Sequence, residues 1–77
     1  MLAIQFGKVL QNMRRNANLS QEKLAELAGY DRTYISLLER GLRQPTITTL
    51  FDIAKALNVT ASSIVKTIED YEGLRHA

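Results

Sequence analysis

Apolar residues return at spacings of three and four along most of the chain, which is the pattern of a helix buried on one face. Phe6, Val9, Leu10 and Met13 show it first, and residues 64–71 repeat it near the other end. No stretch alternates between apolar and polar residues as a half-buried strand does. An all-α fold is therefore predicted, and 77 residues are enough for one domain with one small core.

Capping and turn-forming residues divide this pattern into five expected helices. Ser20, Asp31, Thr46 and Thr60 stand where a side-chain oxygen can accept a hydrogen bond from a first helical turn. Glycine or asparagine follows the first four expected helices, where a positive φ is often needed. The expected helices span residues 3–16, 20–27, 31–40, 47–57 and 60–72. They predict a compact five-helix bundle that occupies residues 1–77 as a single domain.

The buried faces of two helices are predicted from apolar residues at helical spacing. On the second helix this face is expected to hold Leu24, Leu27 and Ala28. On the fourth helix the expected apolar stripe consists of Ile47, Leu50, Phe51, Ala54 and Leu57. Both faces should meet the same core, because a small domain without disulfides depends on tight helix packing or on a partner subunit.

Composition argues against several classes of function. The chain has no cysteine and one histidine, His76, so neither a disulfide nor a thiolate metal site is expected. Ser62 and Ser63 fit the first turn of a helix better than the role of a nucleophile. No apolar run reaches membrane-spanning length, and no signal-peptide pattern is present. We expect no enzyme, cofactor, metal or small-molecule ligand, and a cytoplasmic protein of bacterial or phage type.

Charge is distributed unevenly along the chain. The formal net charge is +2, but residues 1–45 carry seven basic and four acidic side chains, against three and four in residues 46–77. A polyanion would therefore meet the first half of the chain. An asymmetry of this size also arises by chance, so it supports other observations rather than standing alone.

Residues 20–41 contain the residue types that a helix-turn-helix requires. Ala25 is small where two crossing helices approach closely, and Gly29 stands where the chain turns sharply. Ile35 and Leu38 supply the buried side of the second helix of this motif. An ordinary helical hairpin in a bundle would show the same pattern, so the motif by itself leaves both interpretations open.

The outer face of the helix at residues 31–40 favours DNA. Arg32, Thr33, Ser36, Leu37 and Arg40 share one face opposite Ile35 and Leu38, so they should be exposed. Arginine can grip guanine O6 and N7 with two hydrogen bonds, small hydroxyl side chains allow close approach, and leucine can contact a thymine methyl. We predict that the first four of these residues read bases and that the fifth contacts the DNA backbone. A solvated polar face is the alternative, which an exposed leucine fits less well.

Three further residues are candidates for phosphate contacts beside this helix. Gln21 begins the second helix, where free N–H groups and the helix dipole favour an anion. Tyr34 can donate its hydroxyl to a phosphate or simply pack against its neighbours. Arg43, in the loop after the third helix, can reach a backbone strand or a narrow minor groove.

Four sequence blocks resemble the Cro/lambda-repressor-like (XRE) helix-turn-helix family, with family spacing over roughly residues 5–70. They are LSQEKLAELAG at 19–29, YISLLERG at 34–41, PTITTL at 45–50 and IAKAL at 53–57. Within the family, DRTYIS at 31–36 is similar to the controller proteins of restriction–modification systems. The resemblance implies a sequence-specific DNA-binding transcriptional regulator with double-stranded operator DNA as its partner. RNA polymerase is a further candidate partner.

The resemblance also implies roles for individual residues. It makes Gln21 a backbone clamp and places Arg32, Thr33 and Ser36 at reading positions, with Tyr34 and Arg43 at contact positions of the controller branch. It implies that Arg14 and Glu39 form a structural ion pair, although a phosphate contact is the alternative for the arginine. Two residues depart from the pattern: Leu37 replaces a frequently polar residue, and Asp31 puts a carboxylate near phosphates, where it is expected to cap the helix.

A single reading helix covers too few base pairs to select one site in a genome. Two copies related by a two-fold axis would read a palindrome with half-sites one helical turn apart. The expected helix at 60–72 is the predicted dimerisation helix, and its apolar stripe consists of Ile64, Val65, Ile68 and Tyr71. The alternative is that all four complete the monomer core.

A protein–protein module of the same fold, an antitoxin or an adaptor, is the second hypothesis for function. Few residues follow the last expected helix, which favours a free-standing regulator over an antitoxin with a long wrapping tail.

Overall fold

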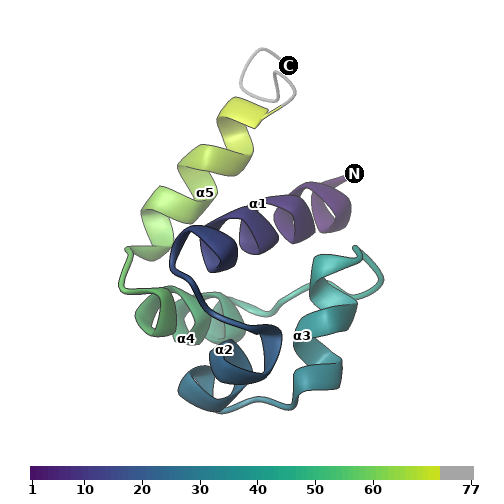
Figure 1. Cartoon of the computed structure of the whole chain (residues 1–77). Helices are drawn as coiled ribbons and strands as arrows, with labels where there is room; N and C mark the ends of the chain where they lie inside the picture. Colours follow the sequence, from purple (N-terminus) through teal and green to yellow (C-terminus); the bar gives the residue numbers. More distant parts are fainter. Residues whose placement is uncertain (72–77) are drawn as a thin grey trace.

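The computed structural model of the chain describes residues 1–71, and this part of the chain forms five helices without a strand (Figure 1). The helices are α1 (Leu2–Asn16), α2 (Gln21–Ala28), α3 (Arg32–Glu39), α4 (Ile47–Leu57) and α5 (Ala61–Asp70). The predicted all-α class is confirmed, and every predicted helix boundary up to the start of α5 lies within one residue of the observed one. His76 and the predicted helix end at residue 72 lie outside the described residues.

Side-chain caps explain where three of the helices begin. The hydroxyl of Ser20 accepts a hydrogen bond from a backbone N–H of α2, and Thr46 and Thr60 do the same for α4 and α5. Asp31 occupies the cap position of α3, but its side chain makes no cap hydrogen bond. The prediction for Asp31 was therefore right about the position and wrong about the hydrogen bond.

The core lies where α1 crosses the other helices. In Figure 1, α1 runs between α5 on one side and the α2–α3 pair on the other. Each of the five helices contributes at least one fully buried side chain, and the largest of these are Leu10, Leu24, Ile35, Leu38, Ile53 and Ile64. Burial of a side chain of this size is worth about 1.5–3 kcal/mol, so these residues supply much of the driving force for folding.

Three predicted core residues are exposed instead. Leu27 is 51% exposed, Ile47 71% and Phe51 59%, whereas Ile53, absent from the predicted stripe, is fully buried. The centre of the α4 stripe is Leu50, Ile53, Ala54 and Leu57, which share one face. Phe51 follows Leu50 directly and is therefore rotated by about 100° around the helix. The predicted stripe and the observed stripe of α4 both have helical spacing, but only the observed one faces the core.

Gly7 allows α1 to approach the end of α3 backbone to backbone. A β-carbon at this position would lie 2.5 Å from the carbonyl oxygens of Leu38 and Glu39, closer than atoms can pack. Gly41, with φ of +73°, brings the chain after α3 against Ile4 in the same region. This close approach, which determines how α1 lies across α3, is not apparent from the helical spacing of the sequence. No helix in residues 1–71 is both long enough and apolar enough to cross a membrane.

Candidate nucleic-acid interface

The turn between α2 and α3 is short and attached to α4. Gly29 adopts a φ of +83°, which is the left-handed conformation predicted for the sharp turn. The next residue, Tyr30, donates its hydroxyl to Asp52 Oδ2 on α4 at 2.6 Å. This hydrogen bond raises the pKa of Tyr30 above that of a free tyrosine, because ionisation would remove the donated proton and place a phenolate beside a carboxylate. The turn therefore has a defined position relative to the core.

Helix α3 separates an inner from an outer face as predicted. Ile35 and Leu38 are fully buried against the core. On the opposite side Arg32, Thr33 and Arg40 are exposed, while Ser36 and Leu37 are half-buried. The expectation of full exposure was therefore too strong for the last two. All five residues still belong to one surface, which offers two guanidinium groups with hydroxyl groups between them.

Gln21 connects the two ends of α3. Its Nε2 donates to Glu39 Oε1 at 3.0 Å, and its Oε1 accepts from Arg32 Nη1 at 3.3 Å. Gln21 is the first residue of α2, so it stands beside the N-terminus of a helix and near the outer face of α3. Gln21 and Arg32 were predicted as separate DNA contacts, because they belong to different helices and helical spacing does not relate their side chains.

Arg14 and Glu39 form the ion pair that the family resemblance implies. Arg14 Nε lies 2.6 Å from Glu39 Oε2, and Nη2 lies 3.1 Å from Oε1. The third nitrogen, Nη1, donates to the Leu19 carbonyl oxygen at 2.8 Å. All three guanidinium nitrogens thus donate inside the protein, and the side chain is 10% exposed. This geometry favours the structural role of Arg14 over the phosphate contact.

Tyr34 and Arg43 extend the surface beyond α3. The Tyr34 ring is half-buried, 5.3 Å from the ring of Tyr30, and its hydroxyl lies 3.5 Å from Thr49 Oγ1. The guanidinium of Arg43 stands over the same Tyr34 ring, 5.9 Å from its centre, in a cation–π contact. The loop after α3 is thereby drawn toward the helix-turn-helix. Tyr34 therefore packs against Tyr30 while part of its ring remains accessible, and Arg43 is exposed beside it.

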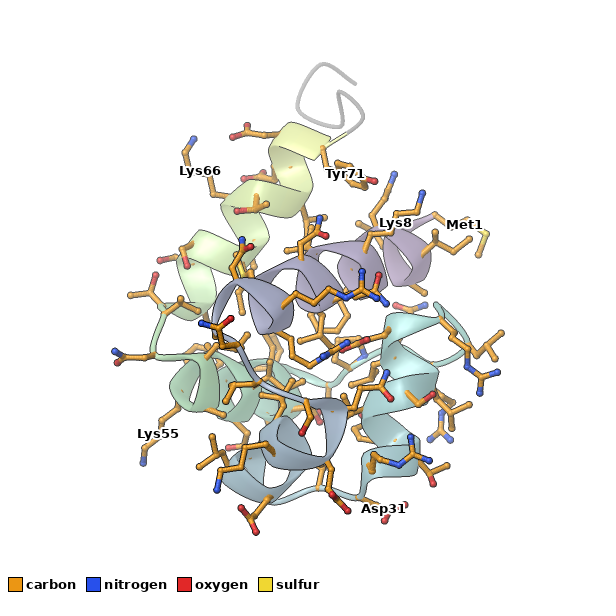
Figure 2. The ribbon with its side chains drawn as sticks, in the orientation of Figure 1. Met1, Lys8, Asp31, Lys55, Lys66 and Tyr71 are labelled. Carbon is orange, nitrogen blue, oxygen red and sulfur yellow. The ribbon has the colours of Figure 1, made fainter. Side chains whose placement is uncertain are left out.

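The predicted interface residues of α5 fall into two groups. Ile64 is 1% exposed and belongs to the monomer core, so it is not available at a surface. Val65 is 42% exposed, and Ile68 and Tyr71 are half-buried. Figure 2 shows Tyr71 beside Lys8 at the opposite end of the molecule from Asp31, and the Lys8 nitrogen lies 5.9 Å from the Tyr71 ring centre.

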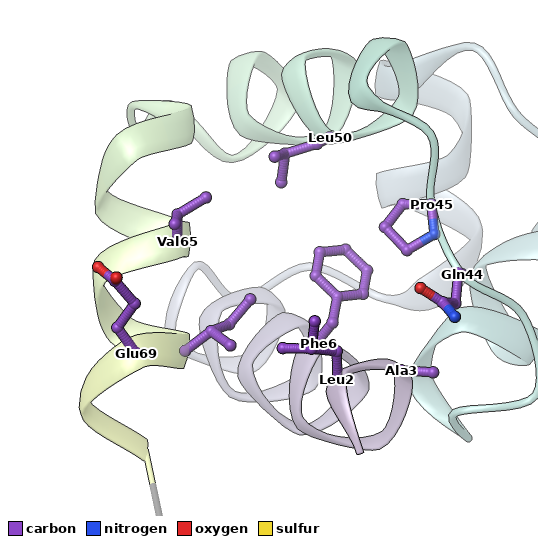
Figure 3. Close-up of a pocket in the computed structure, with 9 residues that line it drawn as sticks. Leu2, Ala3, Phe6, Gln44, Pro45, Leu50, Val65 and Glu69 are labelled. Carbon is purple, nitrogen blue, oxygen red and sulfur yellow. The ribbon is translucent and has the colours of Figure 1, made fainter. Parts of the chain in front are cut away.

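A largely apolar groove of about 510 Å³ runs beside α5 (Figure 3). Val65, Ile68 and Glu69 form one wall, Leu50 and Pro45 another, and the start of α1 with Leu2, Ala3 and Phe6 the third. Leu2 is 60% exposed. The surface of the protein therefore has two contrasting regions: a basic and hydroxyl-rich face on α3, and an apolar groove next to α5.

The helix-turn-helix family model matches residues 10–64, which include the whole two-helix motif and most of the core. The chain belongs to this family. The fold, the left-handed turn at Gly29 and the buried Ile35 and Leu38 are what a helix-turn-helix needs, so the match agrees with the structure. The resemblance to the XRE-like branch is confirmed as well, because proteins named as controllers are similar to this chain over most of its length.

Two relatives and one solved structure illustrate the membership of this helix-turn-helix protein. An uncharacterized HTH-type transcriptional regulator, y4dJ of Sinorhizobium fredii, is 36% identical over 64 residues, 83% of each chain. Control protein C.SmaI of Serratia marcescens is 45% identical over 73% of this chain and 67% of its own. The restriction-modification controller protein C.AhdI of Aeromonas hydrophila superposes with a TM-score of 0.79 at 35% identity, covering 80% of this chain and 94% of that one.

Some members of the family are longer. The chain spans 39% of the length of two regulators from Mycobacterium tuberculosis, to which it is 44% identical over 55 residues. Family membership therefore covers the fold and the helix-turn-helix motif, and it does not transfer the activity of these longer relatives to this chain.

Proposed function

We propose that this protein is a sequence-specific DNA-binding transcriptional regulator that inserts α3 into the major groove. The observation that carries the proposal is the outer face of α3, where Arg32 and Thr33 are exposed while Ile35 and Leu38 are fully buried. An amphipathic helix of this kind can enter the groove without loss of the core. The printed names of the relatives, transcriptional regulators and control proteins, support the same function, and the controller type is the subclass we favour.

Each residue of the surface has a role within this proposal. Arg32, Thr33, Ser36 and Leu37 contact base edges, and Arg32 is the group best suited to guanine because its guanidinium can donate two parallel hydrogen bonds. The backbone contacts belong to Gln21, Tyr34, Arg40 and Arg43, which surround the reading positions. For Tyr34 the contact uses a hydroxyl that is now 3.5 Å from Thr49, so it requires a rotation of that hydroxyl or a shared hydrogen bond.

Selection of bound sequences from a random pool tests the function directly. A regulator of the proposed kind enriches one short sequence, and a palindrome with two spaced half-sites would establish symmetry at the same time. Enrichment of no sequence would contradict the proposal. In that event an antitoxin or adaptor role becomes the better interpretation, and the groove beside α5 is then the surface to examine.

The proposed unit of function is a homodimer on a palindromic operator. One copy of α3 reads a few base pairs, which is too little to select a genomic site. We assign the interface to the accessible residues Val65 and Ile68 of α5 and to Tyr71, which directly follows the helix, together with the adjoining groove. Ile64 is excluded because it is buried in the monomer.

The dimer is tested by a charge placed on α5. Val65→Lys should yield monomers in sedimentation and lose cooperative occupancy of the two half-sites, because a buried unpaired ammonium opposes association. Val59→Lys is the matched control, since Val59 is 37% exposed in the segment before α5 and lies outside the groove. A Val65→Lys protein that remains dimeric would refute the interface on α5.

A further inference from the structure

Asp31 carries a negative charge that the fold does not use. It occupies the cap position of α3, but its side chain accepts no hydrogen bond from the first turn of that helix. The backbone carbonyl oxygen of Asp31 starts the helix by accepting from the N–H groups of Tyr34 and Ile35, at 3.0 and 3.2 Å. Within residues 1–71 the carboxylate forms no hydrogen bond or ion pair. Side-chain capping therefore does not explain an aspartate at this position.

The adjacent arginine does not neutralise this carboxylate. Arg32 follows Asp31 directly, but its Nη1 donates to Gln21 Oε1 at 3.3 Å, and no ion pair joins it to Asp31 in the described part of the chain. Both charged side chains are exposed. Figure 2 shows Asp31 at the edge of the molecule, where the chain enters α3. An accepting group and a donating group therefore stand next to each other at the start of α3.

This end of α3 meets DNA in the proposed complex, because the first residues of a reading helix contact base edges in the major groove. DNA carries one negative charge per about 1.7 Å of helix axis. The phosphates repel an unpaired carboxylate, and the carboxylate also loses water when it is enclosed. Asp31 therefore weakens binding to any DNA that offers it no hydrogen-bond donor.

Major-groove base edges offer such a donor at two of the four bases. Cytosine presents its N4 amino group and adenine its N6 amino group. Guanine and thymine present the keto oxygens O6 and O4 at the corresponding places, and a keto oxygen repels a carboxylate. A carboxylate only accepts hydrogen bonds, so Asp31 can separate the amino bases from the keto bases. Arg32 only donates, so it has the opposite preference.

We infer that Asp31 is a specificity-determining residue that accepts a hydrogen bond from a cytosine or adenine amino group and lowers affinity for other DNA. The inference rests on the proposed DNA-binding function and adds a group that increases selectivity while it opposes binding. The repulsion acts on every sequence, whereas the hydrogen bond forms only where an amino group lies within reach. The carboxylate thus widens the difference in affinity between operator and random DNA, chiefly by weakening the binding to random DNA.

Asp31→Ala tests this role, because it removes both the charge and the acceptor from an exposed position. The variant is titrated by fluorescence anisotropy with the selected operator and with random DNA. Affinity for random DNA should rise by about 5-fold, the effect of removing one like-charge pair at contact distance in water. Affinity for the operator should stay within about 2-fold of wild type, because the lost repulsion and the lost hydrogen bond offset each other. The variant should therefore bind random DNA more tightly and discriminate less.

Selection from a random pool identifies the base that Asp31 contacts. The wild type should favour cytosine or adenine at one position of each half-site, and Asp31→Ala should accept all four bases there. Asp31→Asn is the second variant, since it keeps the shape of the side chain without its charge. An amide can donate as well as accept, so this variant should also lose the preference for amino bases. Retention of that preference in both variants would overturn the inference.

The matched control is Glu22→Gln. Glu22 is exposed in the first turn of α2 and, like Asp31, has no hydrogen bond or ion pair through its side chain among the described residues. Loss of its charge should leave the ratio of operator to random-DNA affinity at the wild-type value, because Glu22 is not on the reading helix. A fall as large as that of Asp31→Ala would show an effect of net charge and would overturn the inference.

A purely structural role for Asp31 predicts a different result. If the carboxylate only stabilised α3 through the helix dipole, Asp31→Ala would lower the urea midpoint and leave the affinity ratio unchanged. That outcome would overturn the inference, and so would an equal gain in affinity for both DNAs.

Failure of the inference can be distinguished from failure of the proposed function. A wild-type protein that enriches no sequence refutes the function. A wild-type protein that selects a sequence, while Asp31→Ala selects the same sequence with the same affinity ratio, refutes the role of Asp31 alone.

Discussion

Helices α3 and α5 each place apolar side chains in the core, but their remaining surfaces differ. α3 fully buries Ile35 and Leu38 and presents arginine and hydroxyl groups outside. α5 fully buries Ile64 alone and leaves Val65 42% exposed beside an apolar groove. A surface rich in donors suits a polyanion, whereas an apolar one suits another protein. The proposed function therefore assigns these two helices of one small chain to different partners.

The largest expected effect concerns the inner end of α3. Glu39→Ala leaves the Arg14 charge buried without its carboxylate, and loss of one partner of a buried pair costs about 3–5 kcal/mol. The free energy of unfolding, measured in urea, should fall by that amount. Lys23→Ala is the control, because the Lys23–Glu26 pair is exposed and its removal should leave the unfolding midpoint unchanged. A small effect of Glu39→Ala would show that α3 does not depend on this pair.

The next effect tests the inner side of α5. Ile64→Ala creates a cavity in the core and should lower the free energy of unfolding by about 2–5 kcal/mol. Its neighbour provides the comparison, because Val65→Ala removes a side chain that is 42% exposed and should cost much less in the monomer. Both are measured at one low protein concentration, so that association does not contribute. Equal losses would mean that the two residues are buried alike, contrary to the structure.

The outer face of α3 should contribute to binding and little to stability. Arg32→Ala is expected to weaken binding to the selected operator by about 1–3 kcal/mol and to relax preference at one base position in each half-site. Fluorescence anisotropy with operator and random DNA measures both, and the urea midpoint should stay at the wild-type value. If affinity for the two DNAs fell equally, Arg32 would be a phosphate contact instead.

The smallest effect belongs to the residues around that face. Arg43→Ala should weaken binding to all sequences alike and reduce the slope of log affinity against log salt by about one, because one phosphate contact is lost. Lys66→Ala is the matched control, since Lys66 is an exposed cation on α5 that pairs with Asp70 at 3.7 Å. Its salt slope should equal that of wild type. An equal change in both would point to net charge rather than to a contact.

The features of this structure that the sequence predicts best are those formed by residues close together in the chain. Ser20, Thr46 and Thr60 cap helices because a cap requires only a side chain and the three residues after it. Burial is predicted less well, since helical spacing indicates that a stripe exists but not where it is centred. This is why Ile47 and Phe51 were wrongly predicted to be buried: their spacing is as regular as that of the residues that do face the core.

Contacts between distant residues were the hardest to anticipate. Gly7 appears in the sequence as an ordinary small residue of a helix, and its role depends on a carbonyl oxygen of Glu39, 32 positions later. The hydrogen bond from Tyr30 to Asp52 joins a turn to a helix in the same way. For the candidate site, the residues were identified from the sequence, whereas the connection of Gln21 to both Glu39 and Arg32 required the fold.

The hydrogen bond between Tyr30 and Asp52 has a mechanical consequence together with the Arg14–Glu39 pair. The first fastens the chain just before α3 to α4, and the second fastens the last residue of α3 to α1. Helix α3 is thus held at both ends, so it cannot tilt without moving α1 or α4 as well. In the proposed dimer, the two copies of α3 would therefore keep a fixed separation and a fixed relative orientation. One base pair inserted between the half-sites rotates one of them by about 34–36° around the DNA axis, and the DNA rather than α3 would have to twist to compensate for this rotation.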